Sequence, residues 1–336
     1  MSGSAHLRIL VLGGTAWLGR QVCIEAVDRG HEVWCLARGD SGLAAPGATL
    51  IQADRRSEGA YDEVRDQDWD AVLEVVWQPG LVRSALVALR ERTGHWIYVS
   101  SGSVYASHAQ RGANEDAGLL APTDLDEVDI GLYGEAKVAC ELACRSAGDS
   151  SVLIARSGLI GGPGDPSDRA GYWVARAARD PLTPMLVPES PAPLTQVIDV
   201  RDLAAWLIDC AESRTMGIYD AVGPMVTLAE WIELSRKIGG HTGPLVPATD
   251  GWLAAEGVEE FMGPESLPLW LADPEWQGFC ARSGEAAKEA GLAQRPISDT
   301  LTDILAWERE QGLNRARKSG ISSEREAELL TKLART

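Results

Sequence analysis

Residues 7–30, LRILVLGGTAWLGRQVCIEAVDRG, decide the fold that we predict for this chain. The apolar run LRILVL is typical of a buried strand, GGTAWLG is a glycine-rich turn, and the segment after it has helical periodicity that ends at Gly30. A strand, a tight turn and a helix in this order begin a βαβ unit. Since such units join parallel strands through crossover helices, the segment predicts a mostly parallel sheet.

The alternation of strand and helix continues through the first half of the chain. Further strands are predicted over 31–38, 48–54, 70–77, 95–101 and 151–158. The pattern indicates an α/β chain with a Rossmann-type doubly wound parallel sheet and a smaller, mainly helical substrate domain.

The second half of the chain predicts a divided domain organisation. A strand at 195–200 and the helix after it are expected to return to the first domain. The predicted dinucleotide-binding domain therefore comprises 1–160 plus 195–215, the predicted substrate domain comprises 161–194 plus 216–315, and a helical tail covers 316–336.

Composition limits the classes of function. The chain has 336 residues and 45% hydrophobic content, ample for a large core. Its 49 acidic and 31 basic residues give a formal charge of −18, which argues against nucleic acid and anionic membranes as partners and favours a small-molecule substrate. The N-terminal apolar run is too short for a leader or a membrane helix, so we expect a cytoplasmic protein, for which a homodimer is one conceivable assembly. The six cysteines lack metal-binding spacing, so free thiols and no metal are expected.

The glycine turn predicts a dinucleotide-binding site. Glycines between a first strand and a first helix let backbone amides approach a pyrophosphate, and the helix N-terminus adds a favourable partial charge. Glycines required only by the turn geometry are the alternative. The predicted binding residues are Gly13, Gly14, Thr15, Ala16, Trp17, Leu18 and Gly19, followed by Arg20.

Two strand ends bear on the choice of dinucleotide. Asp54 ends the third strand, where its carboxylate could accept a hydrogen bond from adenine or only cap a turn. The second strand ends at Ala37, where an NAD site usually has a carboxylate, and Arg38 follows with a guanidinium that can bind a 2′-phosphate. Together with Arg20 this predicts NADP, with NAD as the alternative because Asp40 lies close behind.

The segment GLYGEAKVACE, residues 131–141, places Tyr133 and Lys137 on one face of a predicted helix. A nearby ammonium favours the phenolate, so Tyr133 could exchange a proton with a substrate oxygen. A surface tyrosine beside a solvated lysine is the alternative. The preceding stretch VSSGSVYAS, residues 99–107, ends a parallel strand, where the hydroxyl of Ser101 or Ser103 could bind the same substrate oxygen.

These segments together resemble the extended short-chain dehydrogenase/reductase superfamily, close to bacterial NAD-dependent epimerase/dehydratase proteins. GLIGGPGD at 158–165 and VIDVRDLAAWL at 197–207 are also similar to family motifs and occur in family order. The resemblance implies that Tyr133 is the general acid/base and that Lys137 binds the cofactor ribose. It implies Ser101, in preference to Ser103, as the catalytic serine. The chain departs from the family at 73–79, LEVVWQP, which has no HxAA motif.

The substrate is predicted from charge and aromatic content. Thr195 stands where nucleotide-sugar enzymes of this superfamily commonly have an arginine, and the stretch APLTQVIDV contains no cation before Arg201. Tryptophans in the second half favour a substrate that lies against indoles, namely Trp173, Trp252, Trp270 and Trp276.

The leading prediction is an NADP-dependent oxidoreductase that interconverts a carbonyl and an alcohol on a neutral, partly apolar small molecule. A nucleotide-sugar epimerase or dehydratase is the alternative. A non-catalytic dinucleotide-sensing protein is the second alternative, although such proteins often lose the Tyr and Lys pair that this chain retains.

Overall fold

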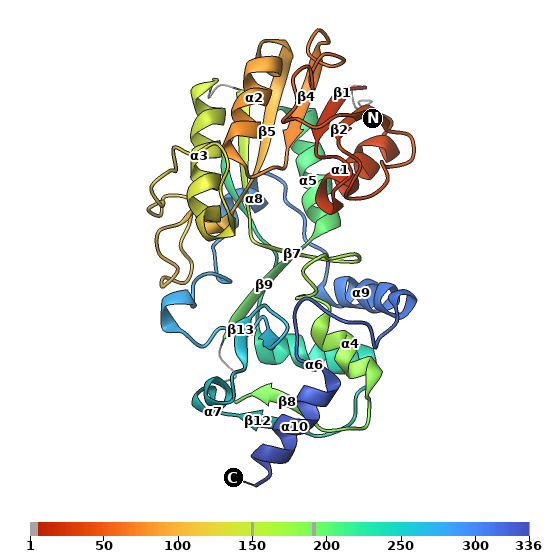
Figure 1. Cartoon of the computed structure of the whole chain (residues 1–336), viewed down its shortest axis with the longest axis vertical. Helices are drawn as coiled ribbons and strands as arrows, with labels where there is room; N and C mark the ends of the chain where they lie inside the picture. Colours follow the sequence, from red (N-terminus) through yellow and green to blue (C-terminus); the bar gives the residue numbers. More distant parts are fainter. Residues whose placement is uncertain (1–5, 149–150, 190–192, 336) are drawn as a thin grey trace.

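The computed structural model describes residues 6–148, 151–189 and 193–335. It divides into a large half around a parallel sheet and a small half below it (Figure 1). Residues 1–5 of the N-terminal segment and 190–192 of the predicted substrate domain lie outside the described residues.

The large half is built on one parallel sheet. Its strands are β1 (Arg8–Leu12), β2 (Glu32–Ala37), β3 (Thr49–Gln52), β4 (Trp69–Glu74), β5 (Thr93–Ser101), β6 (Val152–Ser157) and β10 (Gly217–Ala221). The seven strands pair in the order β10-β6-β5-β4-β1-β2-β3, with parallel neighbours throughout. The chain thus starts in the middle of the sheet and winds outward in both directions, which confirms the predicted doubly wound fold.

The alternation of side chains along β1 explains why both faces of the sheet are covered. Ile9 and Val11 pack into one core cluster, whereas Leu10 and Leu12 pack into another on the opposite face. Helices α1 (Trp17–Asp28) and α5 (Val200–Ser213) cover the first face, and α2 (Pro79–Leu89) and α3 (Tyr133–Ser146) cover the second (Figure 1). A strand that is apolar on both sides requires this sandwich of helices.

The small half is mainly helical around its own core. Its helices are α4 (Tyr172–Arg179), α6 (Leu228–Gly239), α7 (Asp250–Ala255), α9 (Ile297–Gln311) and α10 (Ser323–Leu333). Short parallel pairs join β8 (Met185–Pro188) to β12 (Leu245–Ala248) and β13 (Glu259–Phe261) to β14 (Ser266–Pro268). Its core contains the buried indoles of Trp173, Trp231 and Trp270.

The strand predicted at 195–200 belongs to a separate small sheet. We expected it to return to the first domain, and β9 (Leu194–Asp199) pairs with β7 (Leu159–Gly161) and β11 (Met225–Thr227), not with a strand of the large sheet. The edge of β6 is occupied by β10 instead, although the predicted boundary assigned those residues to the substrate domain. Helix α5 does return to the large half, where it packs against α1. The domain bounds stay a prediction.

The described residues also limit some other classes of site. Cys23, Cys35, Cys140, Cys144, Cys210 and Cys280 are all buried and free. Among the described residues, no group of three or more His, Cys, Asp or Glu side chains could hold a metal ion. In the same part of the chain, no helix combines the length and the apolar character needed to cross a bilayer.

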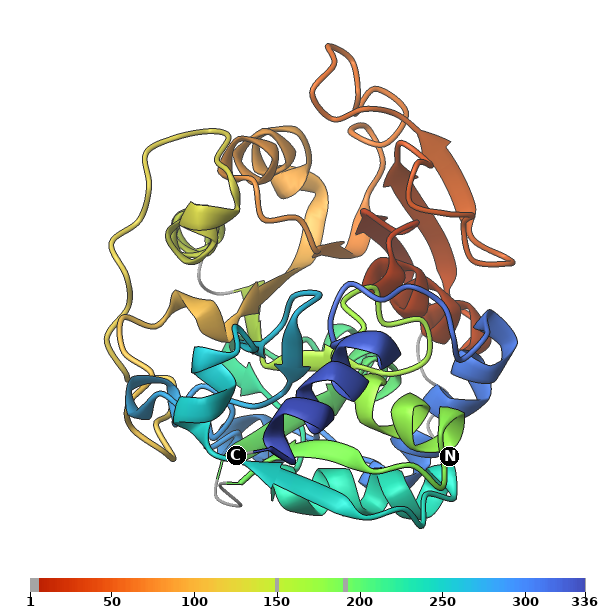
Figure 2. The same cartoon turned by 60° about the horizontal axis from the view of Figure 1, so that its bottom comes forward.

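The C-terminal helix α10 is anchored in the small half by a buried charge. Ser322 caps α10 by accepting a hydrogen bond from the amide of Arg325, within the helical tail that the sequence predicts. One turn further, Glu326 is buried and accepts hydrogen bonds from Arg176 Nε at 2.5 Å and from the amide of Leu186 at 3.0 Å. Figure 2 shows α10 lying across the small half, so this helix is a packed part of the structure.

We expect Glu326→Ala to lower the free energy of unfolding by about 3–5 kcal/mol, because it leaves the buried guanidinium of Arg176 without its carboxylate. Urea denaturation measures this change. Glu328→Ala is the matched control, since Glu328 lies on the same helix but forms exposed ion pairs, and it should change stability little. An equal loss in both variants would contradict the anchoring role of Glu326.

Candidate functional site

The glycine turn between β1 and α1 has room for backbone only. Gly13 has φ +92° and donates a hydrogen bond to Leu36 O at 2.9 Å. A Cβ on Gly14 would lie 2.3 Å from Cys35 Cβ, and a Cβ on Gly19 would lie 2.4 Å from Gly13 O. Helix α1 begins just after this turn without a side-chain cap, so its first amides can bind an anion. The turn therefore fits a pyrophosphate.

A cavity of about 450 Å³ lies beside the turn, at the carboxyl ends of β2, β3 and β4. It is within the usual size of small-molecule sites. Among the predicted binding residues, Gly13, Thr15, Ala16, Arg38 and Asp54 line it. Five other predicted residues are not among its lining residues, namely Gly14, Trp17, Leu18, Gly19 and Arg20. The two glycines of this set instead pack closely, Gly14 against Cys35 and Gly19 against the backbone of Gly13.

Charged groups of both signs line the adenosine end of this cavity. Arg38 Nε lies 3.5 Å from the carboxylate of Asp40, and both side chains are exposed. Asp54 accepts a hydrogen bond from the amide of Arg56 at 3.0 Å, so it caps the local turn as well as lining the cavity. The structure thus leaves both predicted roles of Asp54 open.

A buried ion pair that sequence reasoning did not predict lies under the same cavity. Glu74, at the end of β4, is fully buried and binds Arg55 Nη1 at 3.0 Å and Nη2 at 2.5 Å. Arg55 also donates to Leu81 O at 2.7 Å. This pair joins the ends of β3 and β4 to α2. It gives a structural role to Glu74, the acidic residue of the segment LEVVWQP, which lacks the HxAA motif of the family.

The structure places Tyr133 and Lys137 together at the carboxyl edge of the sheet. Tyr133 is the first residue of α3, and Lys137 Nζ lies 5.9 Å from the centre of its ring. Lys137 is buried and donates to Val99 O at 2.7 Å and to Val76 O at 3.4 Å. Trp77 packs edge-on against the Tyr133 ring with 5.3 Å between ring centres. The pair is therefore part of a built site and not a solvated surface feature.

The two candidate serines adjoin the start of the same helix. Ser101 ends β5, and its Oγ lies 3.2 Å from both the Oγ and the amide of Ser103. Gly134 packs so closely on this loop that a Cβ there would lie 2.5 Å from Ser103 O. The loop that carries both hydroxyls thus packs against the start of α3, the helix that Tyr133 begins, and the choice of Ser101 over Ser103 stays a prediction.

A buried ion pair behind the serine loop fixes its position. Glu141 on α3 binds Arg156 on β6 at 2.8 Å, and Ser100 donates to Glu141 at 2.6 Å. Arg156 also donates to the hydroxyl of Tyr105 at 3.0 Å. These partners could have been suspected from sequence, because a charge inside an apolar strand such as SVLIARSG requires a buried partner.

The network continues to the edge of the sheet. Tyr105 donates to Asp220 on β10 at 2.7 Å, and Arg282 binds the other oxygen of Asp220 at 2.8 Å. The guanidinium of Arg282 also stacks on the Tyr105 ring at 3.4 Å. Burial raises the pKa of Asp220, against the opposing effect of Arg282 and Tyr105. The charges of Arg156 and Arg282 are thereby neutralised by the buried carboxylates of Glu141 and Asp220.

Comparison with solved structures finds the same fold in several proteins that are described as epimerases. A candidate epimerase from Burkholderia cenocepacia matches with a TM-score of 0.70 and 21% identity, over 92% of this chain and 100% of that one. UDP-glucuronic acid 4-epimerase from Bacillus cereus, in complex with NAD, matches with 0.64 and 15% identity over 91% and 99%. WbmG from Bordetella bronchiseptica, in complex with NAD and UDP, matches with 0.67 and 16% identity over 96% and 99%. The chain has the fold of the extended short-chain dehydrogenase/reductases.

Comparison of the sequence with known proteins gives two partial matches. No family model matches the chain. The chloroplast stem-loop binding protein of 41 kDa b from Arabidopsis thaliana is 24% identical over 267 residues, which is 73% of this chain and 66% of that protein. Photosystem II assembly factor Ycf39 from Synechocystis is 46% identical over 48 residues, or 13% of this chain. The chain thus spans 66% and 15% of the lengths of these two relatives.

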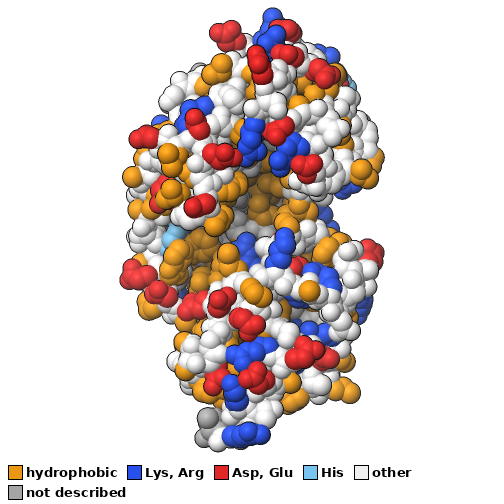
Figure 3. Space-filling view, in the orientation of Figure 1, with side chains coloured by type: hydrophobic (Ala, Val, Ile, Leu, Met, Phe, Trp, Pro, Cys, Tyr) orange, Lys and Arg blue, Asp and Glu red, His pale blue; other side chains and the backbone are white. Residues whose placement is uncertain are grey.

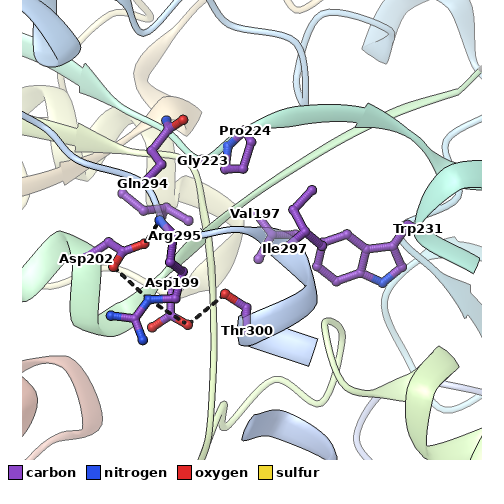
Figure 4. Close-up of a pocket in the computed structure, with 11 residues that line it drawn as sticks. Val197, Asp199, Asp202, Gly223, Pro224, Trp231, Gln294, Arg295, Ile297 and Thr300 are labelled. Carbon is purple, nitrogen blue, oxygen red and sulfur yellow. Dashed lines mark hydrogen bonds and ion pairs between the residues drawn. The ribbon is translucent and has the colours of Figure 1, made fainter. Parts of the chain in front are cut away.

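In this extended short-chain dehydrogenase/reductase fold, the motif VIDVRDLA serves packing. Asp199 accepts a hydrogen bond from Arg201 Nη2 at 2.7 Å. It also accepts one from Thr300 at 2.9 Å, and Arg295 binds Asp202 at 2.7 Å (Figure 4). The hollow around these residues has no room for a water molecule. The network joins α5 to α9 and neutralises both arginines.

The loop between β7 and α4 connects the glycine turn to the small half of the fold. Trp17 in the turn donates its indole N–H to Pro163 O at 2.9 Å. Further along this loop, Arg169 packs 4.9 Å from the centre of the Phe261 ring, and burial lowers its pKa against the pull of Asp165, Cys280 and Tyr133. Arg169 is thus a largely covered cation whose charge interacts with Tyr133, and the sequence did not single it out, because it is one more loop arginine in the stretch that precedes α4.

The predicted tryptophan surface is mostly core. Trp173 and Trp270 are fully buried and Trp252 packs against the same core, whereas Trp276 is 43% exposed. Figure 3 shows a hollow between the two halves, with hydrophobic side chains inside and basic side chains near it. The expectation of a neutral substrate loses one of its grounds, since a cation does lie near Tyr133.

We expect Gly14→Ala to raise the dissociation constant for a nicotinamide dinucleotide at least about tenfold, because the new Cβ would force Cys35 and the turn apart. Calorimetric titration measures the change. Gly251→Ala is the control, since Gly251 has open space around it and no positive φ. Unchanged dinucleotide affinity in Gly14→Ala would remove the glycine turn from the binding site.

Proposed function

We propose that this protein is a dinucleotide-dependent enzyme that oxidises a secondary alcohol of a small molecule, in epimerase or dehydratase chemistry. The observation that carries the proposal is the buried ammonium of Lys137 beside the phenol of Tyr133, with a pair of serine hydroxyls at the same edge of the sheet. Among the described residues, Lys137 forms no ion pair, so its charge can act on the phenol.

The side chains divide the acid–base work. A nicotinamide dinucleotide, when bound, supplies the acceptor and donor of a hydride. Tyr133 would take the proton from the substrate hydroxyl, with the ammonium of Lys137 held 5.9 Å from the centre of its ring. Ser101 would donate a hydrogen bond to the same substrate oxygen, while the carbonyl of Val99 holds Lys137 in place.

Two observations support epimerase or dehydratase chemistry over net reduction of a neutral carbonyl. The solved structures with this fold include three 4-epimerases of UDP-sugars and a protein bound to NAD and UDP. Arg169 also provides a positive charge near Tyr133, which a neutral substrate would not use. Net oxidation or reduction is the second candidate, favoured by the hydrophobic hollow of Figure 3.

We propose NAD as the cofactor, with NADP as the alternative. Several structures with this fold contain NAD. Asp40 gives a physical reason in this chain, since its carboxylate lines the cavity, can accept hydrogen bonds from ribose hydroxyls and would repel a 2′-phosphate. Arg38, which favours NADP, is partly neutralised by Asp40.

A role in nucleic-acid binding, suggested by the name of the Arabidopsis relative, is not supported by the charge of this chain. Its formal charge of −18 would repel a phosphate backbone. A cytoplasmic location and a homodimer stay predictions.

Tyr133→Phe should lower turnover by about 10²–10⁴-fold and leave dinucleotide affinity nearly unchanged, because the hydroxyl acts mainly in the transition state. The test uses UDP-glucose and UDP-glucuronic acid with NAD, followed by proton NMR for a C4 epimer and by absorbance for reduced cofactor. An epimer without net reduced cofactor supports the proposal, whereas reduced cofactor that accumulates with substrate supports the second candidate.

Ser101→Ala should lower the same turnover more than Ser103→Ala does, since the resemblance assigns Ser101 to the substrate oxygen. The reverse order would assign the role to Ser103. Full activity in Tyr133→Phe would disprove the acid–base assignment itself.

Dissociation constants for NAD and NADP decide the cofactor. We expect tighter binding of NAD, weaker NAD binding in Asp40→Ala because a ribose partner is lost, and tighter NADP binding in the same variant because a repelling charge is removed. Arg38→Ala is the matched variant and should weaken NADP alone. Tighter NADP binding in the unmodified protein would reverse the assignment.

A further inference from the structure

Arg169 differs from the other arginines near the site in how its charge is used. Arg156, Arg282 and Arg55 are each bound to a buried carboxylate. In the described part of the chain, Arg169 forms no ion pair, and its Nε donates only to the Ser167 hydroxyl at 3.0 Å. No carboxylate in the described residues contacts this largely covered guanidinium directly, and only the more distant charge of Asp165 partly offsets its desolvation, so the guanidinium can still bind an anion.

The surroundings of Arg169 fix its position between the glycine turn and the small half of the fold. Its loop is tied to the glycine turn through the hydrogen bond from Trp17 to Pro163 O, and its guanidinium lies over the Phe261 ring. Phe261 is a bulky residue at φ +64°, a strained backbone geometry that persists only where the surroundings impose it. The Phe261 residue that packs against Arg169 is therefore held in place by its surroundings.

An aromatic group continues from this residue. It consists of Phe261, Phe279, Trp276 and His108, with ring centres 4.8–5.6 Å apart along the series. Burial, with the nearby charge of Arg282, lowers the pKa of His108 to about 4, so His108 adds no positive charge at neutral pH. Its Nδ1 is buried without a hydrogen-bond partner among the described residues. Arg169 thus lies next to an aromatic group in which His108 Nδ1 is available to form a hydrogen bond.

The number of unpaired cations near Arg169 favours a carboxylate over a phosphate or diphosphate as its ligand. A phosphate or diphosphate usually requires more than one cation, but the neighbouring arginines Arg156 and Arg282 are committed to Glu141 and Asp220. A single planar guanidinium matches one carboxylate through two parallel hydrogen bonds.

We propose that Arg169 binds a carboxylate of the substrate, so that the enzyme acts on a hydroxy acid whose alcohol reaches Tyr133 and whose apolar part lies on the aromatic group. This inference rests on the proposed function, because it takes the space beside Tyr133 as the substrate site. It makes Arg169 a specificity-determining residue of that site and gives the substrate at least one negative charge.

Mandelate and mandelamide test the proposal with the protein saturated with NAD. Both probes carry a secondary alcohol and a phenyl ring, and they differ only in carboxylate against amide. Titration calorimetry should show mandelate binding at least about tenfold more tightly than mandelamide. Arg169→Gln should abolish this preference by weakening mandelate alone, Arg169→Lys should restore part of it, and Arg92→Gln, on an exposed arginine at the other end of β5, should leave it unchanged.

Each contrary result overturns the assignment. Equal binding of the two probes, absence of saturable mandelate binding, or a preference that survives Arg169→Gln excludes Arg169 as a carboxylate site. Weaker NAD binding in Arg169→Gln would assign its charge to the dinucleotide. These readouts are independent of turnover, so failure of the Tyr133→Phe test with an intact mandelate preference would disprove the proposed chemistry and leave the carboxylate site standing.

Discussion

The buried ion pair between Glu141 and Arg156 is the interaction on which the geometry of the site depends. It joins α3, which carries Tyr133 and Lys137, to β6 in the sheet, and Ser100 extends it to the end of β5. Both charged side chains are almost fully buried, so the pair persists only because further hydrogen bonds satisfy them. The same constraint that aligns α3 with the strand ends therefore keeps the phenol, the ammonium and the serines within one small region.

The rest of the network extends this constraint to the last strand of the sheet. Tyr105, in the serine loop, binds Asp220 on β10, and Arg282 binds the same carboxylate from a segment far along the chain. The loop that ends β5 is thus held from two sides by groups that cannot move without exposing a charge to apolar surroundings. A rigid serine loop of this kind is what a site for proton transfer requires, because small displacements cost much of the rate.

The distribution of cations explains how a strongly acidic protein can still bind anions. The chain carries a formal charge of −18, and several of its arginines near the site are neutralised inside structural pairs. The amides of the glycine turn lie beside the cavity, and the guanidinium of Arg169 forms no ion pair in the described part of the chain, so both can stabilise a negative charge. Local geometry, and not net charge, then sets which anion binds.

The local part of this structure could be predicted from sequence alone. The run from Leu7 to Gly30 specifies its own strand, turn and helix, because hydrophobic periodicity and glycine act over a few residues, and the spacing of Tyr133 and Lys137 places them on one helical face for the same reason. The pairing of β10 with β6, the separate sheet of β9 and the pairing of Glu74 with Arg55 could not be predicted, because each joins segments whose affinity appears only when they meet. The same holds for Arg169, which is an ordinary loop residue in the sequence. Only the tertiary structure decides that it lies over the Phe261 ring and, within the described residues, forms no ion pair, because that depends on packing between segments that share no local pattern.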